Sequence, residues 1–136
     1  MTLVVDASLA VTWYFIDEQT DATRALFRRV GKEGAVVPAL WKLEMANVFQ
    51  MALRRKRISA SFRDEALQDL AFVPIEIDSE TQEHSWGATV GIADRYDLTI
   101  YDASYLELAQ RRRLALATLD GKLIAAASGA GVEVLP

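Results

Sequence analysis

Short apolar runs alternate with longer helical patterns along the chain, and this alternation is what most constrains the fold. The runs are rich in Val, Ile and Leu without strict polar alternation, which is typical of parallel strands buried on both faces. Five strands are predicted, at residues 2–6, 35–37, 74–77, 114–118 and 132–135. Helices are expected between them, over about residues 8–16, 20–33, 39–56, 60–72, 79–95, 102–113 and 120–128.

Strands and helices in this order predict right-handed crossovers and an α/β fold, a three-layer α/β/α sandwich with a parallel sheet of about five strands. The chain has 136 residues, 51% of them apolar, so we expect one domain over residues 1–136 with a sizeable core. Trp13, Trp41 and Trp86 fall in predicted amphipathic helices, where packing in a core or interface is expected rather than base stacking.

The composition excludes several kinds of site and location. The absence of Cys excludes disulfides and thiolate metal sites, and a single His84 cannot build a multi-His zinc site. No apolar stretch is long enough to span a bilayer, and no basic segment precedes the first apolar run as in a signal peptide. We therefore expect a cytoplasmic protein that does not associate with membranes.

The net charge is −4 and the pI is near 5.0, so the chain is a poor general binder of polyanions. Contact with a nucleic acid would need a local basic patch. Three basic clusters exist, within residues 28–32, 54–57 and 111–113. Each lies at the end of a predicted helix, where cations complement the helix dipole, so a purely structural interpretation competes with RNA binding.

Four carboxylates occupy positions that such a fold brings to one edge of the sheet. Asp6 ends the first predicted strand, and Asp120 closes the apolar run that contains the fourth. Asp102 begins a helix, and Glu44 lies in a mostly apolar helix. In open parallel sheets, ligands bind beyond the carboxyl ends of the strands. Gathered carboxylates repel one another unless a cation holds them, and without Cys or several His that cation is a hard ion such as Mg²⁺ or Mn²⁺. The pattern predicts a metal-dependent phosphodiesterase.

Each acid also has a structural interpretation. Asp6 and Asp102 could be helix N-caps, and Asp120 with Gly121 is a common turn pair. Glu44 lies on an apolar stripe, where a buried salt bridge to an arginine is the alternative to a metal.

Three further polar residues are predicted as accessory to the site. Ser8 could orient Asp6 or a metal-bound water, and Thr118 could supply a hydroxyl at the end of its strand. Asn47 follows Glu44 by about one helical turn on nearly the same face and could hold its carboxylate.

Four segments, in this order, resemble the PIN-domain ribonucleases, and closely resemble the VapC-type toxins of bacterial toxin–antitoxin pairs. They are Val4–Ser8, Pro38–Val48, Leu98–Ala109 and Leu116–Leu123. Each segment alone is a weak signal, whereas four in sequence over nearly the whole chain are fairly specific.

The resemblance implies a PIN-like fold and a metal-dependent endoribonuclease that uses Mg²⁺, with Mn²⁺ as a substitute. It assigns both metal binding and catalysis to an acidic quartet, Asp6, Glu44, Asp102 and Asp120. Thr118 and Asn47 match accessory positions. It further implies an RNA substrate, often transfer RNA, a homodimer, and a small antitoxin protein whose tail blocks the site.

Two other classes of protein are alternatives. A response-regulator receiver domain needs paired acids after the first strand, but only Asp6 stands there, and Glu44 has no role in that scheme. A haloacid-dehalogenase-like phosphatase needs a second Asp where Ser8 stands. A non-catalytic RNA-binding or interaction module would keep the fold without needing a metal.

Overall fold

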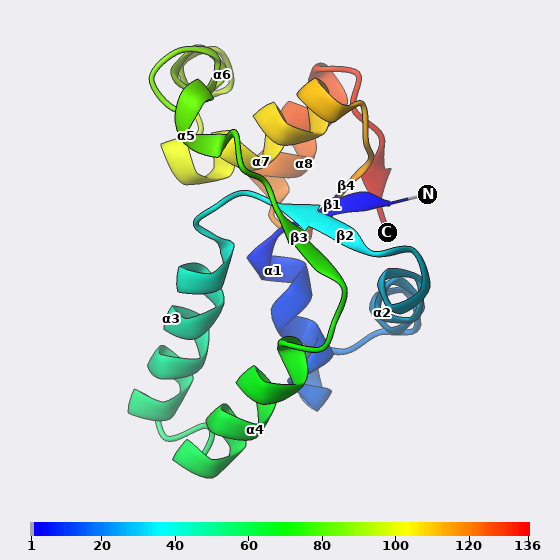
Figure 1. Ribbon diagram of the computed structural model, residues 1–136, viewed down its shortest axis with the longest axis vertical. Helices are drawn as coiled ribbons and strands as arrows, with labels where there is room; N and C mark the ends of the chain where they lie inside the picture. Colours follow the sequence, from blue (N-terminus) through cyan, green and yellow to red (C-terminus); the bar gives the residue numbers. More distant parts are fainter. Residues whose placement is uncertain (1) are drawn as a thin grey trace.

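The computed structural model describes residues 2–136 and contains a five-stranded, all-parallel sheet in the order β3-β2-β1-β4-β5 (Figure 1). The strands are β1 (Leu3–Val5), β2 (Ala35–Val37), β3 (Ile75–Ile77), β4 (Leu116–Ala117) and β5 (Val134–Leu135). All five predicted strands are confirmed, with shorter ends. Since β1 is the third strand of five, Asp6 follows the central strand.

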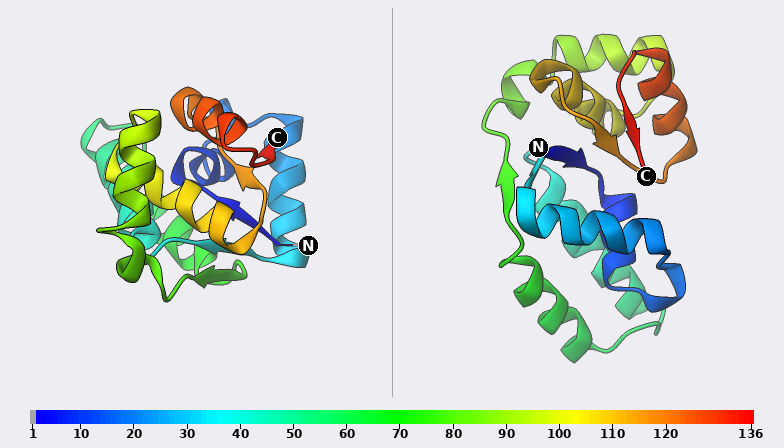
Figure 2. Two further views of the ribbon diagram at one scale, coloured as in Figure 1. Left: turned by 90° about the horizontal axis from the view of Figure 1, so that it is seen from above. Right: turned by 90° about the vertical axis from the view of Figure 1, so that its right-hand side faces the viewer.

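Helices cover both faces of the sheet, which confirms the predicted α/β architecture. They are α1 (Ala7–Ala10), followed by 3-10 turns at Val11–Trp13 and Ile16–Glu18, α2 (Asp21–Glu33), α3 (Trp41–Arg54), α4 (Ala60–Leu70), α5 (Thr81–His84), α6 (Ala88–Tyr96), α7 (Ile100–Arg112) and α8 (Gly121–Gly129). In the views of Figures 1 and 2, α1–α4 lie on one side of the sheet and α5–α8 on the other. The chain changes side after β3, so the strand order reverses between β1 and β4.

The core forms around the central strand, because the sheet is covered on both faces. All three residues of β1, Leu3 to Val5, are fully buried, which explains why its sequence shows no polar alternation. Phe49 of α3 and Leu106 of α7 pack into the same core from opposite sides. Within residues 2–136, no helix is both long and apolar enough to cross a membrane.

Two predicted helices differ from the observed ones. The helix expected over residues 79–95 is split into α5 and α6 by a turn at residues 85–87, where Gly87 has a non-helical ψ of −101°. Trp86 lies in this turn and is 96% exposed, so it does not pack in the core, and its packing in an interface stays a prediction. Trp13 and Trp41 are buried as expected. The helix expected over residues 8–16 is one α turn followed by 3-10 turns.

Candidate active site

Asp6 and Asp120 reach the same edge of the sheet because β1 and β4 are neighbouring parallel strands, with Val5 opposite Ala117. Asp6 directly follows β1, and Asp120 comes three residues after the end of β4. The strand order reverses between these two strands, which is where open α/β sheets bind ligands.

Asp6 is the most buried of the four acids, at 4% exposure. Its Oδ1 accepts hydrogen bonds from the Leu9 amide (3.1 Å) and the Ser8 hydroxyl (2.8 Å), and its Oδ2 accepts one from Thr118 (2.6 Å). Asp6 is therefore the N-cap of α1, as the structural interpretation has it. Oδ2 can still take a second partner, since a carboxylate oxygen can accept two hydrogen bonds and Oδ2 accepts one.

Ser8 and Thr118 tie the loop after β1 to the loop after β4. Besides donating to Asp6, the Ser8 hydroxyl accepts a hydrogen bond from the Leu119 amide (3.1 Å). The Thr118 hydroxyl accepts one from the Asp120 amide (3.0 Å). The two hydroxyls thus fix both acids of this edge relative to each other, a role that the sequence indicated only in part.

Asp102 does not cap its helix. Helix α7 begins two residues earlier than predicted, and Thr99 is its N-cap, accepting a hydrogen bond from the Asp102 amide (3.1 Å). The carboxylate of Asp102 lies in the first turn, where the helix dipole favours negative charge. Asp120 is not a turn residue either. It caps α8 by accepting from the Leu123 amide (3.0 Å).

Glu44 is held by a tyrosine and not by an arginine. The hydroxyl of Tyr105, which is 1% exposed, donates a hydrogen bond to Glu44 Oε1. The salt-bridge alternative for Glu44 is therefore wrong, and so is the expected contact with Asn47, which is exposed and makes no hydrogen bond to it. Tyr105 was missed in the sequence, although it follows Asp102 by one helical turn on α7 and so shares a face with it.

The four carboxylates interact electrostatically with one another. Burial raises the pKa of Asp6, and repulsion from Asp102 adds to this effect. Burial likewise raises the pKa of Glu44, with repulsion from Asp102 and Asp6 adding to it, although the Tyr105 hydrogen bond opposes the rise. The pKa of Asp102 is raised by burial and by repulsion from Asp120. The structure thus brings all four acids into one negative cluster.

Nothing within residues 2–136 neutralises this cluster, because no Lys, Arg or His forms an ion pair with any of the four acids. Among the described side chains, no three of these carboxylates bring oxygens within 4.8 Å of one another. This spacing suits a hydrated divalent ion that is held partly through water. The all-oxygen donor set fits Mg²⁺ or Mn²⁺.

Comparison with known proteins identifies the class. The model of the PIN domain matches residues 3–129, and the chain belongs to the PIN-domain family. Proteins of this family are typically nucleases that use a divalent metal ion. Membership in this family rules out the receiver domain and the haloacid-dehalogenase-like phosphatase as alternatives.

Two solved structures share the fold. PAE2754 from Pyrobaculum aerophilum is 23% identical, with a TM-score of 0.69 over 93% of this chain and 84% of that chain. FitAcB from Neisseria gonorrhoeae is 15% identical, with a TM-score of 0.67 over 100% of this chain and 97% of that chain. No curated protein sequence matches the chain. At these identities the likeness establishes the PIN-like fold alone.

Proposed function

We propose that this protein is a metal-dependent endoribonuclease that hydrolyses phosphodiester bonds of RNA. The observation that carries the proposal is a cluster of one buried and three partly buried carboxylates, at the point where the strand order reverses, that forms no ion pair with a basic residue within residues 2–136. The metal would be held by Asp6, Glu44, Asp102 and Asp120, which we also propose as the catalytic residues. Mg²⁺ is the expected ion and Mn²⁺ its substitute.

When bound, the ion activates water and stabilises negative charge on the reacting phosphate. The protein contributes rigid ligands. Ser8 and Thr118 fix the two oxygens of Asp6, and Tyr105 fixes Glu44. Ligands held in this way need no reorganisation when the ion and substrate arrive.

Flanking phosphates need basic side chains, and the three clusters differ in availability. Arg111 and Arg112 are engaged in ion pairs with acidic residues, which favours the structural interpretation of that cluster. Residues 54–56 at the end of α3 are exposed and form no ion pair within residues 2–136. Arg54 lies on the same helix as Glu44, about 15 Å further along its axis. An RNA strand bound at the acidic quartet could therefore reach Arg54 with a phosphate a few nucleotides away. We propose residues 54–56 as the contact to the RNA backbone.

The test is cleavage of RNA, including transfer RNA, by purified protein with Mg²⁺, Mn²⁺ or a chelator. We expect cleavage only with the metals, and Asp102→Asn should lower the rate roughly 100-fold. Asp94→Asn is the matched control, because Asp94 is an exposed acid on neighbouring α6. Failure of folded protein to cleave any RNA would overturn the proposal, and metal-independent RNA binding without cleavage would favour a non-catalytic module.

We further propose that the enzyme is the toxin of a type II toxin–antitoxin pair, acting in the cytoplasm as a homodimer. Resemblance to the VapC-type toxins supports this. The acidic site also suits an antitoxin segment carrying an arginine, since a guanidinium pairs with carboxylates and competes with the metal. Expression alone should arrest bacterial growth, Asp120→Ala should relieve the arrest, and sequencing of RNA 5′ ends should locate the cuts. Normal growth despite abundant folded protein would remove the toxin role and leave a nuclease.

A further inference from the structure

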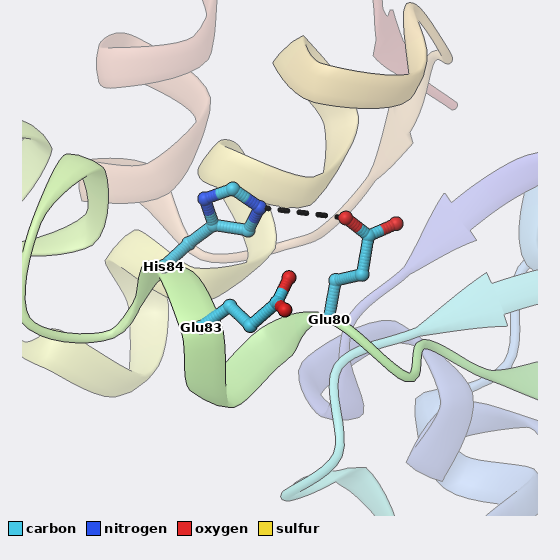
Figure 3. A group of neighbouring side chains, drawn as sticks. All are labelled: Glu80, Glu83 and His84. Carbon is cyan, nitrogen blue, oxygen red and sulfur yellow. Dashed lines mark ion pairs between the residues drawn. The ribbon is translucent and has the colours of Figure 1, made fainter.

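A second group of potential metal ligands lies beyond the carboxyl end of the edge strand β3, apart from the acidic quartet. Glu80 precedes α5, and Glu83 and His84 lie within it. One ligand atom from each side chain comes within 4.8 Å of the others. Figure 3 shows the carboxylate of Glu83 between the His84 ring and Glu80, so the three side chains converge on one point.

His84 gives an observation that is independent of this clustering. Its Nε2 atom is buried and has no hydrogen-bond partner within residues 2–136. The nearest acidic oxygen, Oε1 of Glu80, is 3.8 Å away, which is too far for a hydrogen bond (Figure 3). A buried ring nitrogen without a partner is unfavourable. A cation between Nε2 and the two carboxylates would satisfy all three groups.

A carboxylate that is held in place lies near the other nitrogen of the His84 ring. Nδ1 of His84 lies 3.9 Å from Oε1 of Glu107, a residue that is 5% exposed. Arg111 holds Glu107 in place through a 2.7 Å bond from Nε to Oε1. At 3.9 Å this contact is not a hydrogen bond, but its negative charge favours a proton on Nδ1 and so a lone pair on Nε2, the nitrogen that faces the proposed ion.

The local charge also leaves room for a cation. Arg111 is the one basic side chain that pairs with this group within residues 2–136, and it contacts Asp78 and Glu107 as well as Glu80 (3.5 Å). Three carboxylates thus share one guanidinium, and Glu83 adds a fourth that forms no ion pair within residues 2–136. The Glu80 side chain is 54% exposed and Glu83 is exposed as well, so an ion can approach from the side of these carboxylates.

We propose that Glu80, Glu83 and His84 form a second metal site, which takes a borderline transition-metal ion such as Zn²⁺. Glu107 orients His84 and does not bind the ion. An imidazole with carboxylates suits Zn²⁺, whereas the all-oxygen quartet suits Mg²⁺. The three ligands lie on α5 and on the residue before it, so the ion would stabilise this short helix. This inference does not depend on the proposed nuclease function.

His84 is the only histidine of the chain, so its ring signals report this site without interference. The experiment is Zn²⁺ titration of nitrogen-15-labelled full-length protein at neutral pH, followed through the imidazole nitrogens and by calorimetry. We expect the Nε2 resonance to shift to a metal-bound position with one ion per chain. Glu83→Gln should weaken this binding at least ~10-fold. Glu65→Gln, which removes an exposed helical carboxylate on α4, should not change it.

Three outcomes would overturn the proposal. They are an imidazole spectrum unchanged by millimolar Zn²⁺, an Nε2 that carries a proton throughout the titration, and a Zn²⁺ affinity that Glu83→Gln leaves intact. Zn²⁺ bound by the acidic quartet would appear as heat without a shift of Nε2. Because Mg²⁺-dependent RNA cleavage is expected to survive Glu83→Gln, failure of this site and failure of the nuclease proposal are distinguishable.

Discussion

Two groups of carboxylates lie beyond the carboxyl ends of the same sheet, and they differ in whether residues 2–136 supply a cation. The acidic quartet follows the central strands and forms no ion pair with a basic residue of the described chain. Beside edge strand β3, Asp78 and Glu107 are both 5% exposed, and Arg111 bridges them with bonds of 2.7 Å to each.

The pKa directions reflect this difference. Burial opposes the charged form of Asp78, but hydrogen bonds from Arg111 and Thr81 outweigh it and lower its pKa. In the quartet, burial and mutual repulsion prevail, so the pKa values of Asp6, Glu44 and Asp102 are raised. Removal of the arginine from the first group would leave buried charges uncompensated, whereas the raised pKa values of the quartet support the proposed metal site.

The largest effect is expected where the internal cation is removed. Arg111→Met removes the arginine that pairs with the buried carboxylates of Asp78 and Glu107, which should destabilise the protein by about 3–5 kcal/mol. Denaturant unfolding measures this loss. Arg112→Met is the matched control, because its pair with Glu76 is exposed and contributes at most ~1 kcal/mol. Equal losses for the two variants would mean that Arg111 has no special structural role.

In the quartet, removal of a charge should affect activity and leave stability intact. Glu44→Gln is expected to lower metal-dependent RNA cleavage roughly 100-fold. Its unfolding free energy without metal should stay equal or rise, because a half-buried charge repelled by Asp102 and Asp6 is removed. The measurements are a cleavage assay and denaturant unfolding in chelator. A destabilised variant whose folded fraction cleaves normally would show that Glu44 is structural.

The features that sequence predicted well are those fixed by local pattern. Strands buried on both faces have apolar runs, so all five were found, and an acid within a few residues of a strand's carboxyl end lies near that edge of the sheet. Asp6 and Asp120 are therefore predictable from position alone. Helix boundaries were less certain, because Thr99 competes with Asp102 as the cap of α7 and the structure uses the threonine.

The contacts that sequence missed join distant segments. Tyr105 bonds to Glu44 across 61 positions, and Arg111 reaches Asp78 across 33. No periodicity encodes such pairs, because they depend on how α7 packs against the rest of the fold. Trp86 was misplaced because amphipathic spacing continues through residues 79–95, while Gly87 breaks the helix locally.

Tyr105 and Arg111 each hold a carboxylate in place, but by different interactions. Tyr105 holds Glu44 through a neutral hydroxyl, whereas Arg111 holds Asp78 through a positive charge. Tyr105→Phe should weaken Mn²⁺ binding about 10-fold by releasing Glu44, while the metal-free fold is retained. Calorimetry in the His84→Asn background isolates the quartet from the second proposed site. Tyr14→Phe, which removes a 2.7 Å bond from a tyrosine hydroxyl to Asp69 elsewhere, is the control. Unchanged affinity in Tyr105→Phe would exclude positioning by this hydroxyl.

The smallest expected effect concerns pH without metal. Because the pKa of Asp102 is raised in the folded protein, the folded state holds more protons than the unfolded chain between the unfolded pKa of about 4 and the higher folded value. The contribution of Asp102 to stability therefore falls as pH rises through this window. Asn does not titrate, so the free energy of unfolding of Asp102→Asn should rise relative to that of the parent as the pH goes from about 4 to about 7. Solvent screening keeps this relative rise below ~1 kcal/mol.

Denaturant unfolding in chelator at both pH values measures this relative gain, with Asp94→Asn as the control acid on α6. A relative loss for Asp102→Asn at neutral pH would mean that the carboxylate already has a cationic partner in the metal-free protein, and the contrast with the Asp78 group would fail. Added Mg²⁺ should act in the opposite direction. An ion that binds only the folded state stabilises the parent protein. Asp102→Asn should lose most of that stabilisation, because the negative charge of Asp102, which is unfavourable in the empty site, is the charge that would hold the metal.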